Sequence, residues 1–499
     1  YSYLMIPFIS IFGLNTLSIR LPMALIGCIS LVVFYYFMKS TFGNKKSALF
    51  LFIFAIFPWH LMKSRWGLES NIFPDLILWA LFTMYVGIQN KNNWFMVLSG
   101  IIFGISTYSY GTSYFFVPVL LALLYISLFI VKKLNIKQCI IHLFTTTIIS
   151  LPMILFVIVN FFDLDALTLG PITKLPTVRF KEITAVGSGV NSNIFGNFIN
   201  NIKMLFTNDG NILNYTKPYG LFLCNWITIP ITIIGIVVSI YKQISFFKSK
   251  IDCNLQVTQH LQDTQKTQNF YNVPPKSQNS NCGLVYTIIN CFFIASLLLM
   301  FMVDGAINRI NVIFIPLVFY TVIGIINLGK VWFVPVITYF ILFTFMEHYY
   351  FTDYQTYISS YMNFGLKEAV VEAYNIVDTS NTHEYGNAEQ TNSSNNENLE
   401  TIKKLHIDNS INQPYIFYLL YNEIPTPYYI NNVHKSNENE MFQTINSIGN
   451  VYFTIPTELD VNNVYIFRNS TLEKYKTLYN NLSEFNIQEY QEFVMLNAT

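Results

Sequence analysis

The fold class is decided by residues 284–303, LVYTIINCFFIASLLLMFMV, which are twenty consecutive residues without a charge. A helix of this length spans about 30 Å, the thickness of the hydrocarbon core of a bilayer. Comparable apolar runs recur along the first 351 residues. With this one they number ten, at 21–38, 47–62, 70–88, 94–111, 114–131, 138–162, 219–241, 284–303, 310–328 and 331–351. Because the runs are continuously apolar and do not alternate, they predict an α-helical polytopic membrane protein with about ten transmembrane helices.

The charges divide the chain of 499 residues into two regions. Only 11% of all residues are charged, against about 25% in soluble globular domains. Residues 1–351 hold 22 Lys and Arg with 10 Asp and Glu, whereas residues 352–499 hold 7 and 18. We therefore expect a transmembrane region over 1–351, followed by a hydrophilic domain over 352–499.

The hydrophilic region has the patterns of a small α/β domain. Helical signals occur at 365–377 and 470–485, and short apolar or aromatic runs at 414–420, 451–455 and 463–467 predict strands. The segment 379–401 is rich in Asn, Thr and Glu and predicts a loop. No cysteine lies in this region, which excludes a disulfide framework there.

Basic residues in the connections predict the orientation. One alternating set of connections holds 13 lysines, whereas the short connections of the other set hold Lys63, Arg65 and Arg309, or four cations with Arg20. By the positive-inside rule the lysine-rich set is cytoplasmic. The prediction is a multi-pass protein of the plasma membrane with 163–218 as an outer loop and an extracytoplasmic C-terminal domain. The polar segment 242–282 is then a flexible cytoplasmic loop.

Within the predicted outer loop, residues 194–206 have apolar side chains on one face of a helix. Such a helix suits the membrane interface. A helix packed within an outer loop explains the pattern equally well.

Several function classes are excluded. A net charge of +1 and the lack of a basic run argue against a nucleic-acid partner. The six cysteines lack metal-binding spacing, and no P-loop, GxGxxG, HExxH or GxSxG motif is present.

The candidate functional residues lie at the predicted outer face. The loop 57–71, FPWHLMKSRWGLESN, gathers His60, Lys63, Arg65 and Glu69 between two membrane helices. If this loop is helical, Arg65 and Glu69 share a face. A cation there can hold a lipid phosphate, and a carboxylate can orient that cation or accept a proton. An anchoring cation with a weak surface ion pair is the competing explanation.

Three further places carry polar groups at the same level. Asp75 follows Pro74 one turn into the next helix, where a carboxylate is costly, although a hydrated structural Asp explains it equally well. The connection 304–311, DGAINRIN, presents Asn308 and Arg309, and a basic anchor explains Arg309 equally well. The turn 108–114, YSYGTSY, presents Tyr108 and Tyr110, which either line a cavity or belong to the aromatic belt.

Short motifs give a family resemblance. They are YSYLMIPF at 1–8, FGLN at 12–15, SIRLP at 18–22, FG at 42–43, FPWH at 57–60, SRWGLE at 64–69, YGTS at 110–113, VP at 117–118 and NRINVIFIP at 308–316. Together they resemble glycosyltransferase family 39, the protein O-mannosyltransferase and aminoarabinose-transferase relatives with the GT-C fold. The resemblance covers most of residues 1–330.

The resemblance implies sugar transfer from a polyprenyl-phosphate donor to a lipid, glycan or protein acceptor at the outer face. Arg65 and Arg309, with Lys63 as an auxiliary, would bind the donor phosphate. His60, Asp75, Tyr108, Tyr110 and Asn308 would line the cavity. The family's essential acidic residue would fall upstream of Tyr1, and since the chain begins inside an apolar stretch, we expect a fragment lacking that residue. Glu69 is then the remaining candidate base. A divalent metal is compatible with this chemistry, although no ligand set is visible, and no other cofactor is implied.

Two other functions remain open at this stage. A transporter or flippase for a lipid-linked sugar also needs an outward polar cavity, although we find no inverted repeats. A catalytically inactive membrane scaffold for the outer domain is the other.

Overall fold

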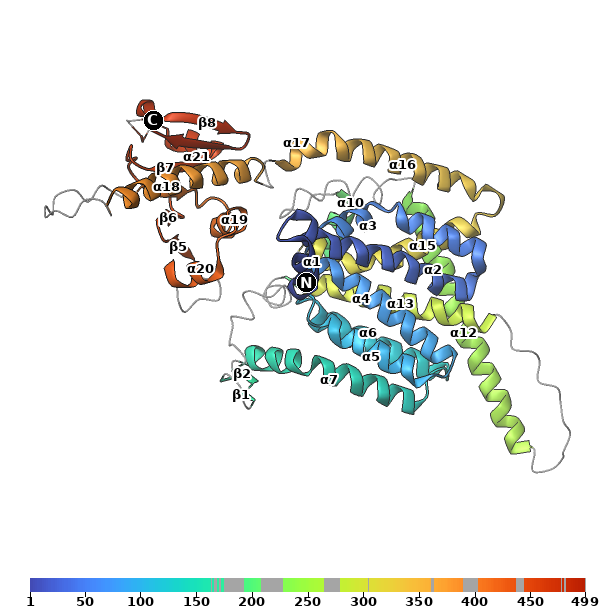
Figure 1. Cartoon of the computed structure of the whole chain (residues 1–499). Coiled ribbons are helices and arrows are strands. Elements are labelled where there is room, and N and C mark those ends of the chain that lie inside the picture. Colours follow the sequence, from blue (N-terminus) through green and yellow to red (C-terminus); the bar gives the residue numbers. More distant parts are fainter. Residues whose placement is uncertain are drawn as a thin grey trace. The chain divides into compact units, whose positions relative to one another are not determined.

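The computed structural model (Figure 1) describes residues 1–162, 164–165, 168–169, 172–174, 193–207, 228–263, 279–303, 305–359, 363–388, 403–436, 444–476, 478–479 and 482–498. They form two compact units, Tyr1–Phe351 and Thr352–Thr499. The division falls where the charge composition changes. Most of the predicted outer loop 163–218 lies outside the described residues.

The first unit is a helical bundle. Its elements are α1 (Ser2–Phe12), α2 (Thr16–Ala55), α3 (Pro58–Arg65), α4 (Glu69–Gln89), α5 (Asn93–Ser106), α6 (Ser113–Ile130), α7 (Ile136–Phe161), the hairpin β1 (Thr168–Leu169) and β2 (Ile172–Lys174), α10 (Ile194–Thr207), α12 (Thr228–Asp263), α13 (Asn279–Met302), α14 (Ile307–Ile310), η2 (Asn311–Ile313), α15 (Phe314–Asn327), η3 (Gly329–Val331) and α16 (Phe333–Phe351). Among the described residues, eight helical segments are long and apolar enough to cross a membrane. The predicted α-helical polytopic architecture is confirmed.

The sequence predicts ten membrane spans, whereas the described residues contain eight helical segments of that kind, and the difference has two local causes. The runs 21–38 and 47–62 fall largely within α2, which is interrupted only at Gly43, where φ is 76°. This positive φ suits glycine, and the break turns one long helix into two consecutive segments. The run 94–111 yields α5, which has only 14 residues because it ends in the turn before α6.

The predicted loop over 242–282 needs a correction. Helix α12 continues to Asp263 and α13 begins at Asn279, so both ends of this segment are helical. Its polar composition was misleading because a helix that extends beyond the apolar span does not require an apolar face. Residues 264–278 lie outside the described part.

Two glycines let α12 and α15 approach closely. A Cβ atom on Gly235 would lie 1.7 Å from the Tyr320 carbonyl oxygen, and one on Gly324 would lie 2.0 Å from the Ile231 carbonyl oxygen. Between them the Thr232 and Thr321 hydroxyls are hydrogen-bonded at 2.8 Å. Small residues at the contact with a polar pair beside them are typical of membrane helix packing.

The second unit contains a mixed sheet with helices. Its helices are α17 (Asp353–Ser359), α18 (Leu366–Ala388), α19 (Pro414–Tyr421), α20 (Thr426–Asn432), α21 (Asn469–Tyr475) and η4 (Leu482–Glu484). Its strands are β3 (Leu405–Ile407), β4 (Val433–Lys435), β5 (Ile445–Ile448), β6 (Val451–Tyr452), β7 (Val464–Arg468), β8 (Asn486–Tyr490) and β9 (Phe493–Asn497). The strand order is β4-β5-β6-β3-β7-β9-β8, with β3 parallel to both neighbours.

Apolar residues cover both faces of this sheet. This is expected because successive side chains of β7 are apolar and point to opposite faces. Val464 and Ile466 join a core cluster with residues of α18 and with Tyr418 of α19. Tyr465 and Phe467 point to the other face, where they cluster with residues such as Leu472 and Tyr479. An α/β domain with its own core is therefore present.

Three local predictions in this unit differ from the structure. The run 414–420 is helix α19, since Pro414 occupies its first turn, a position that favours helix initiation. Helix α18 extends through Ala388 into the predicted loop, and the helical signal at 470–485 divides into α21 and η4. The runs 451–455 and 463–467 correspond to β6 and β7, as predicted.

His406 predicts a pH dependence for this domain. Its ring lies between those of Tyr452 and Tyr465, at 5.2 and 5.1 Å. Burial, together with nearby Lys404, lowers the pKa of His406 from 6.5 to about 4. In the unfolded chain this histidine takes up a proton near pH 6.5, whereas in the folded domain it does so only near pH 4. Its contribution to stability is therefore fully present above pH 6.5 and is lost as the pH falls towards 4. Allowing for solvent screening, we expect residues 352–499 expressed alone to unfold cooperatively and to lose about 1–2 kcal/mol over this range.

Thermal melting between pH 7 and 4 measures this loss. Acidic side chains also titrate there, so His406→Phe is the informative comparison because it keeps the ring stack without the titration. His434→Gln, at an exposed position in β4, is the matched control. Identical melting curves for His406→Phe and the parent across the range would contradict the assignment.

Candidate functional site

The α3–α4 region is held together by a buried ion pair. Phe57 is extended and Pro58 begins α3, which places Lys63 towards α4. The Lys63 ammonium donates a hydrogen bond to the Asp75 carboxylate, and both side chains are 0% exposed. Burial lowers the pKa of Lys63, and the Asp75 carboxylate opposes that change. The ammonium also lies 5.4 Å from the centre of the Trp59 ring.

This geometry corrects two sequence predictions. Lys63 is engaged with Asp75 inside the protein and is not exposed for binding a lipid phosphate. Asp75 is enclosed as its partner and does not line an open cavity. The pair instead links the last turn of α3 to the second turn of α4.

Arg65 and Glu69 lie on this loop and are both exposed. Trp66 and Leu68 between them are extended, so α3 ends at Arg65 and α4 begins at Glu69. The expected shared helical face therefore does not form. The Arg65 guanidinium stacks against Tyr350 of α16, 4.8 Å from its ring centre. Sequence analysis missed Tyr350 because it lies 285 positions away in the chain.

The loop containing Arg309 packs beside the start of α4. The Asn311 side-chain amide donates to the Ser70 carbonyl oxygen at 2.9 Å, and α14 and η2 both contact α4. Arg309 is half-buried in this loop. Asn308 is also half-buried, and within the described residues its Oδ1 atom is buried without a hydrogen-bond partner. The structure thus brings together the loops that carry Arg65, Glu69, Asn308 and Arg309.

His60 lies behind this surface. It is 4% exposed and packs against Phe54, with ring centres 4.4 Å apart. Gly27 of α2 lets α3 pack closely against α2, because a Cβ atom there would lie 2.2 Å from Ser64 Oγ and 3.8 Å from His60 Nε2. In the described part of the chain, neither ring nitrogen makes a hydrogen bond of ordinary geometry. His60 belongs to the α2–α3 interface, which corrects its predicted place in a cavity wall.

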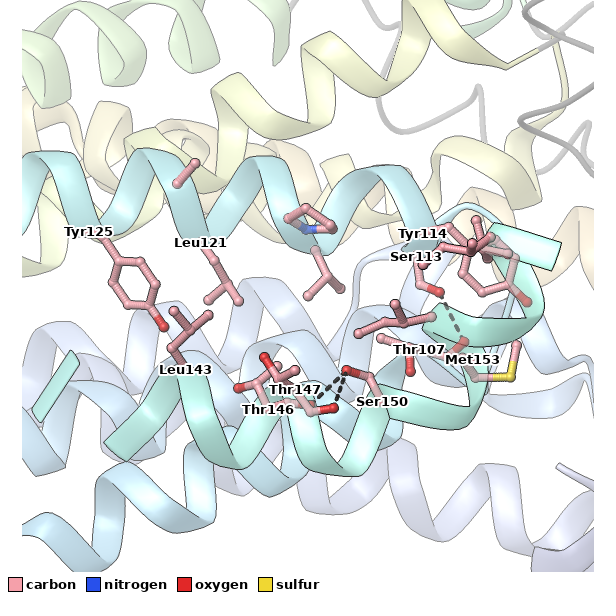
Figure 2. A pocket seen from close by; sticks show the side chains of 16 residues that line it. Thr107, Ser113, Tyr114, Leu121, Tyr125, Leu143, Thr146, Thr147, Ser150 and Met153 are labelled. Atoms are coloured by element: carbon pink, nitrogen blue, oxygen red, sulfur yellow. Dashed lines mark hydrogen bonds between the residues drawn. The ribbon is translucent and has the colours of Figure 1, made fainter. Parts of the chain in front are cut away.

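Tyr108 and Tyr110 occupy the predicted turn between α5 and α6. The exposed Tyr108 donates from its hydroxyl to the Ile149 carbonyl oxygen in α7 at 2.8 Å, and Tyr110 is half-buried. The turn lies at one end of a groove of about 500 Å³ between α6 and α7, although neither tyrosine lines it. Figure 2 shows the groove running from Thr107, Ser113 and Tyr114 to Leu121, Tyr125 and Leu143.

The groove is predominantly apolar. Val117, Leu121, Ile154 and Ile158 are among its lining residues. Several lining hydroxyls bond to backbone carbonyls, as Ser113 does to Thr107 and Ser150 to Thr146 (Figure 2). Those groups are therefore satisfied without a ligand, and the surface suits a hydrocarbon chain.

A series of hydrogen bonds beside the groove was not predicted from the sequence. The Tyr125 hydroxyl lies 2.6 Å from His142 Nδ1, and His142 Nε2 lies 3.0 Å from Ser99 Oγ. Because Ser99 donates its proton to the Ala80 carbonyl, His142 must donate from Nε2 and accept from Tyr125 at Nδ1. This series of hydrogen bonds links the helices from α4 to α7. A histidine inside an apolar run was the sequence signal that could have found it.

Among the described residues, no group of three or more His, Cys, Asp or Glu side chains is arranged to hold a metal ion.

The helical membrane bundle, followed by a unit that contains a sheet, is consistent with the GT-C class of membrane glycosyltransferases. Within that class, residues 1–159 match the family model described as dolichyl-phosphate-mannose-protein mannosyltransferase. The match confirms the resemblance to glycosyltransferase family 39 over residues 1–159, which include the α3–α4 loop but not Asn308 and Arg309. No curated protein and no solved structure matches the chain.

Proposed function

We propose that this protein moves a sugar from a polyprenyl-phosphate donor to an acceptor at the outer face of the plasma membrane. The observation that carries the proposal is the contact of the α3–α4 loop with the α14–η2 loop through Asn311 and Ser70. It joins two segments that are 241 positions apart in the chain, and these segments adjoin Arg65 and Arg309. The family match supplies the chemical class.

Arg65 and Arg309 bind the donor phosphate in this proposal. Guanidinium groups hold phosphate oxygens with paired, charge-assisted hydrogen bonds. The Tyr350 ring restricts the orientations of Arg65, which reduces the entropy lost when the phosphate binds. Negative charge grows on the phosphate as the sugar–phosphate bond breaks, and cations positioned beforehand stabilise that charge.

The transfer reaction needs one carboxylate to accept the proton that the acceptor loses. An acceptor O–H or N–H attacks the anomeric carbon of the sugar, and the bond from that carbon to the phosphate oxygen breaks. The electron pair of that bond stays with the polyprenyl phosphate, and the acceptor proton passes to a carboxylate. Glu69 is our candidate, since it is exposed at the start of α4, four positions after Arg65. A lipid, a glycan and a protein are all acceptors with suitable hydroxyl or amine groups.

The groove between α6 and α7 suits the lipid part of the donor. From Leu143 to Ile158 along α7 the lining covers about 22 Å at 1.5 Å per residue. Its apolar side chains suit a prenyl chain, and its end near the α5–α6 turn would direct the phosphate towards the loops. The transfer reaction is tested by following a radiolabelled sugar from such a donor to a new product.

The outer-face placement predicts a labelling pattern. In a variant without native cysteines, Lys435→Cys in β4 should react with a membrane-impermeant thiol reagent in intact cells, whereas Lys330→Cys in η3 should not. Both positions are exposed, so the membrane decides the difference. Reaction at position 330 but not at 435 would reverse the proposed orientation, and permeabilised cells provide the control for reactivity.

A further inference from the structure

Helix α10 is docked against α13 through one face only, and this face carries asparagine side chains. On the docked face, the Asn201 amide donates to the carbonyl oxygens of Met300 and Val303, at 3.0 and 2.9 Å. Asn197 on the same face donates to the Phe301 carbonyl oxygen at 3.3 Å. The polar residues of α10 thus satisfy carbonyl groups of the last turn of α13 and of Val303 just after it, which α13 itself leaves without partners.

An aromatic contact fixes the same junction. The rings of Phe198 and Phe301 stack with their centres 4.3 Å apart and their planes 9° apart. Helix α10 also contacts α14, which carries Arg309. The docked face therefore holds α10 where the membrane span of α13 ends.

The opposite face is apolar and exposed. Phe195 is 72% exposed and Ile199 is 63% exposed, and the half-buried Ile202 follows on the same side at helical spacing. Exposed aromatic and aliphatic side chains in a row are unfavourable in water. They are favourable at the boundary between headgroups and acyl chains, where interfacial helices bury one face.

We infer that α10 is a membrane-surface helix that inserts Phe195, Ile199 and Ile202 into the lipid interface. The occupant of this face is the bilayer itself, because the helix is attached within one turn of the end of a membrane span. Asn200 is exposed on another side of the helix and remains in contact with water, whereas Lys203 lies one turn after Ile199 at the edge of the apolar row. By holding α13 and α14 at this level, α10 sets the depth at which the Arg309 loop meets the membrane.

Spin-label accessibility tests the inference without any enzymatic assay. Nitroxide labels are placed singly at Phe195→Cys, Ile199→Cys and Asn200→Cys in a variant of the whole chain lacking native cysteines, reconstituted in phospholipid vesicles. We expect collisions with oxygen to exceed those with a water-soluble nickel chelate at 195 and 199, and the order to reverse at 200. Ile199 and Asn200 are exposed and take no part in the aromatic contact with Phe301, so labels there leave that contact intact, whereas Phe195 also meets the Phe301 ring edge-on at 6.1 Å.

Preferential nickel collisions at both 195 and 199 would place this face in water and overturn the inference. Low collision rates with both reagents would mean that protein covers the face, which overturns it as well. Should the Phe195→Cys variant fail to fold, Ile202→Cys replaces it. Asn201→Ala gives a second measurement, since freeing α10 from α13 should raise the mobility of the label at 200 and leave the 199 label in lipid.

Discussion

Replacing Lys63 with methionine while Asp75 remains should lower the unfolding free energy of the membrane unit by about 3–5 kcal/mol. The two groups are 0% exposed and bonded to each other. Removing one leaves a carboxylate in an apolar surrounding, where it must either stay charged at high cost or take up a proton. Thermal or denaturant unfolding of the purified protein in detergent measures the change.

The double variant Lys63→Met with Asp75→Leu separates charge from packing. We expect it to recover most of the lost stability, because apolar side chains of similar volume can replace a buried ion pair at little cost. Lys330→Met removes an exposed lysine and should change stability by no more than about 0.5 kcal/mol. Equal destabilisation by the single and double variants would show that the site depends on shape and not on the ion pair.

Arg65→Ala should reduce sugar transfer by about 100- to 1,000-fold with little loss of stability. The side chain is exposed and its main described contact is the Tyr350 ring, so its removal leaves no buried group without a partner. Arg65→Lys should recover only part of the activity, because an ammonium lacks the paired geometry of a guanidinium. Initial rates at several donor concentrations report both binding and turnover.

The matched control for Arg65 is Lys330→Ala, which removes an exposed cation from η3. It should leave transfer within about twofold of the parent, since a distant exposed charge is screened by salt. Wild-type turnover in Arg65→Ala would remove this residue from the phosphate site. Loss of folding in Arg65→Ala would instead assign Arg65 a structural role with Tyr350.

The sequence predicts the membrane helices well because hydropathy depends on local composition. What it missed arises from contacts between distant residues. The break between α3 and α4 is one example, since the Tyr1 ring packs against Gly67, where a Cβ atom would lie 3.0 Å from the ring. The Tyr1 hydroxyl in turn donates to the Ile19 carbonyl oxygen at 2.5 Å. No local periodicity reveals such a contact.

The candidate site was predicted in part for the same reason. Arg65, Glu69 and Arg309 stood out as charges in short connections, and the structure brings their loops together. Lys63 stood out by the same rule, but it is buried in an ion pair with Asp75, which lies 12 positions further on. Tyr350 and the Tyr125–His142–Ser99 chain depend on tertiary packing and gave only weak sequence signals.

The most direct test of the central claim is the fate of the sugar and of its carrier lipid. The intact protein in vesicles is supplied with a polyprenyl-phosphate sugar labelled separately in the sugar and in the lipid, together with membrane extract as a source of acceptor. We predict that sugar label appears in a new product while an equal amount of free polyprenyl phosphate is released, and that both signals fall together in Arg65→Ala. Movement of intact donor across the bilayer, without cleavage of the sugar–phosphate bond, would contradict the account and favour a flippase.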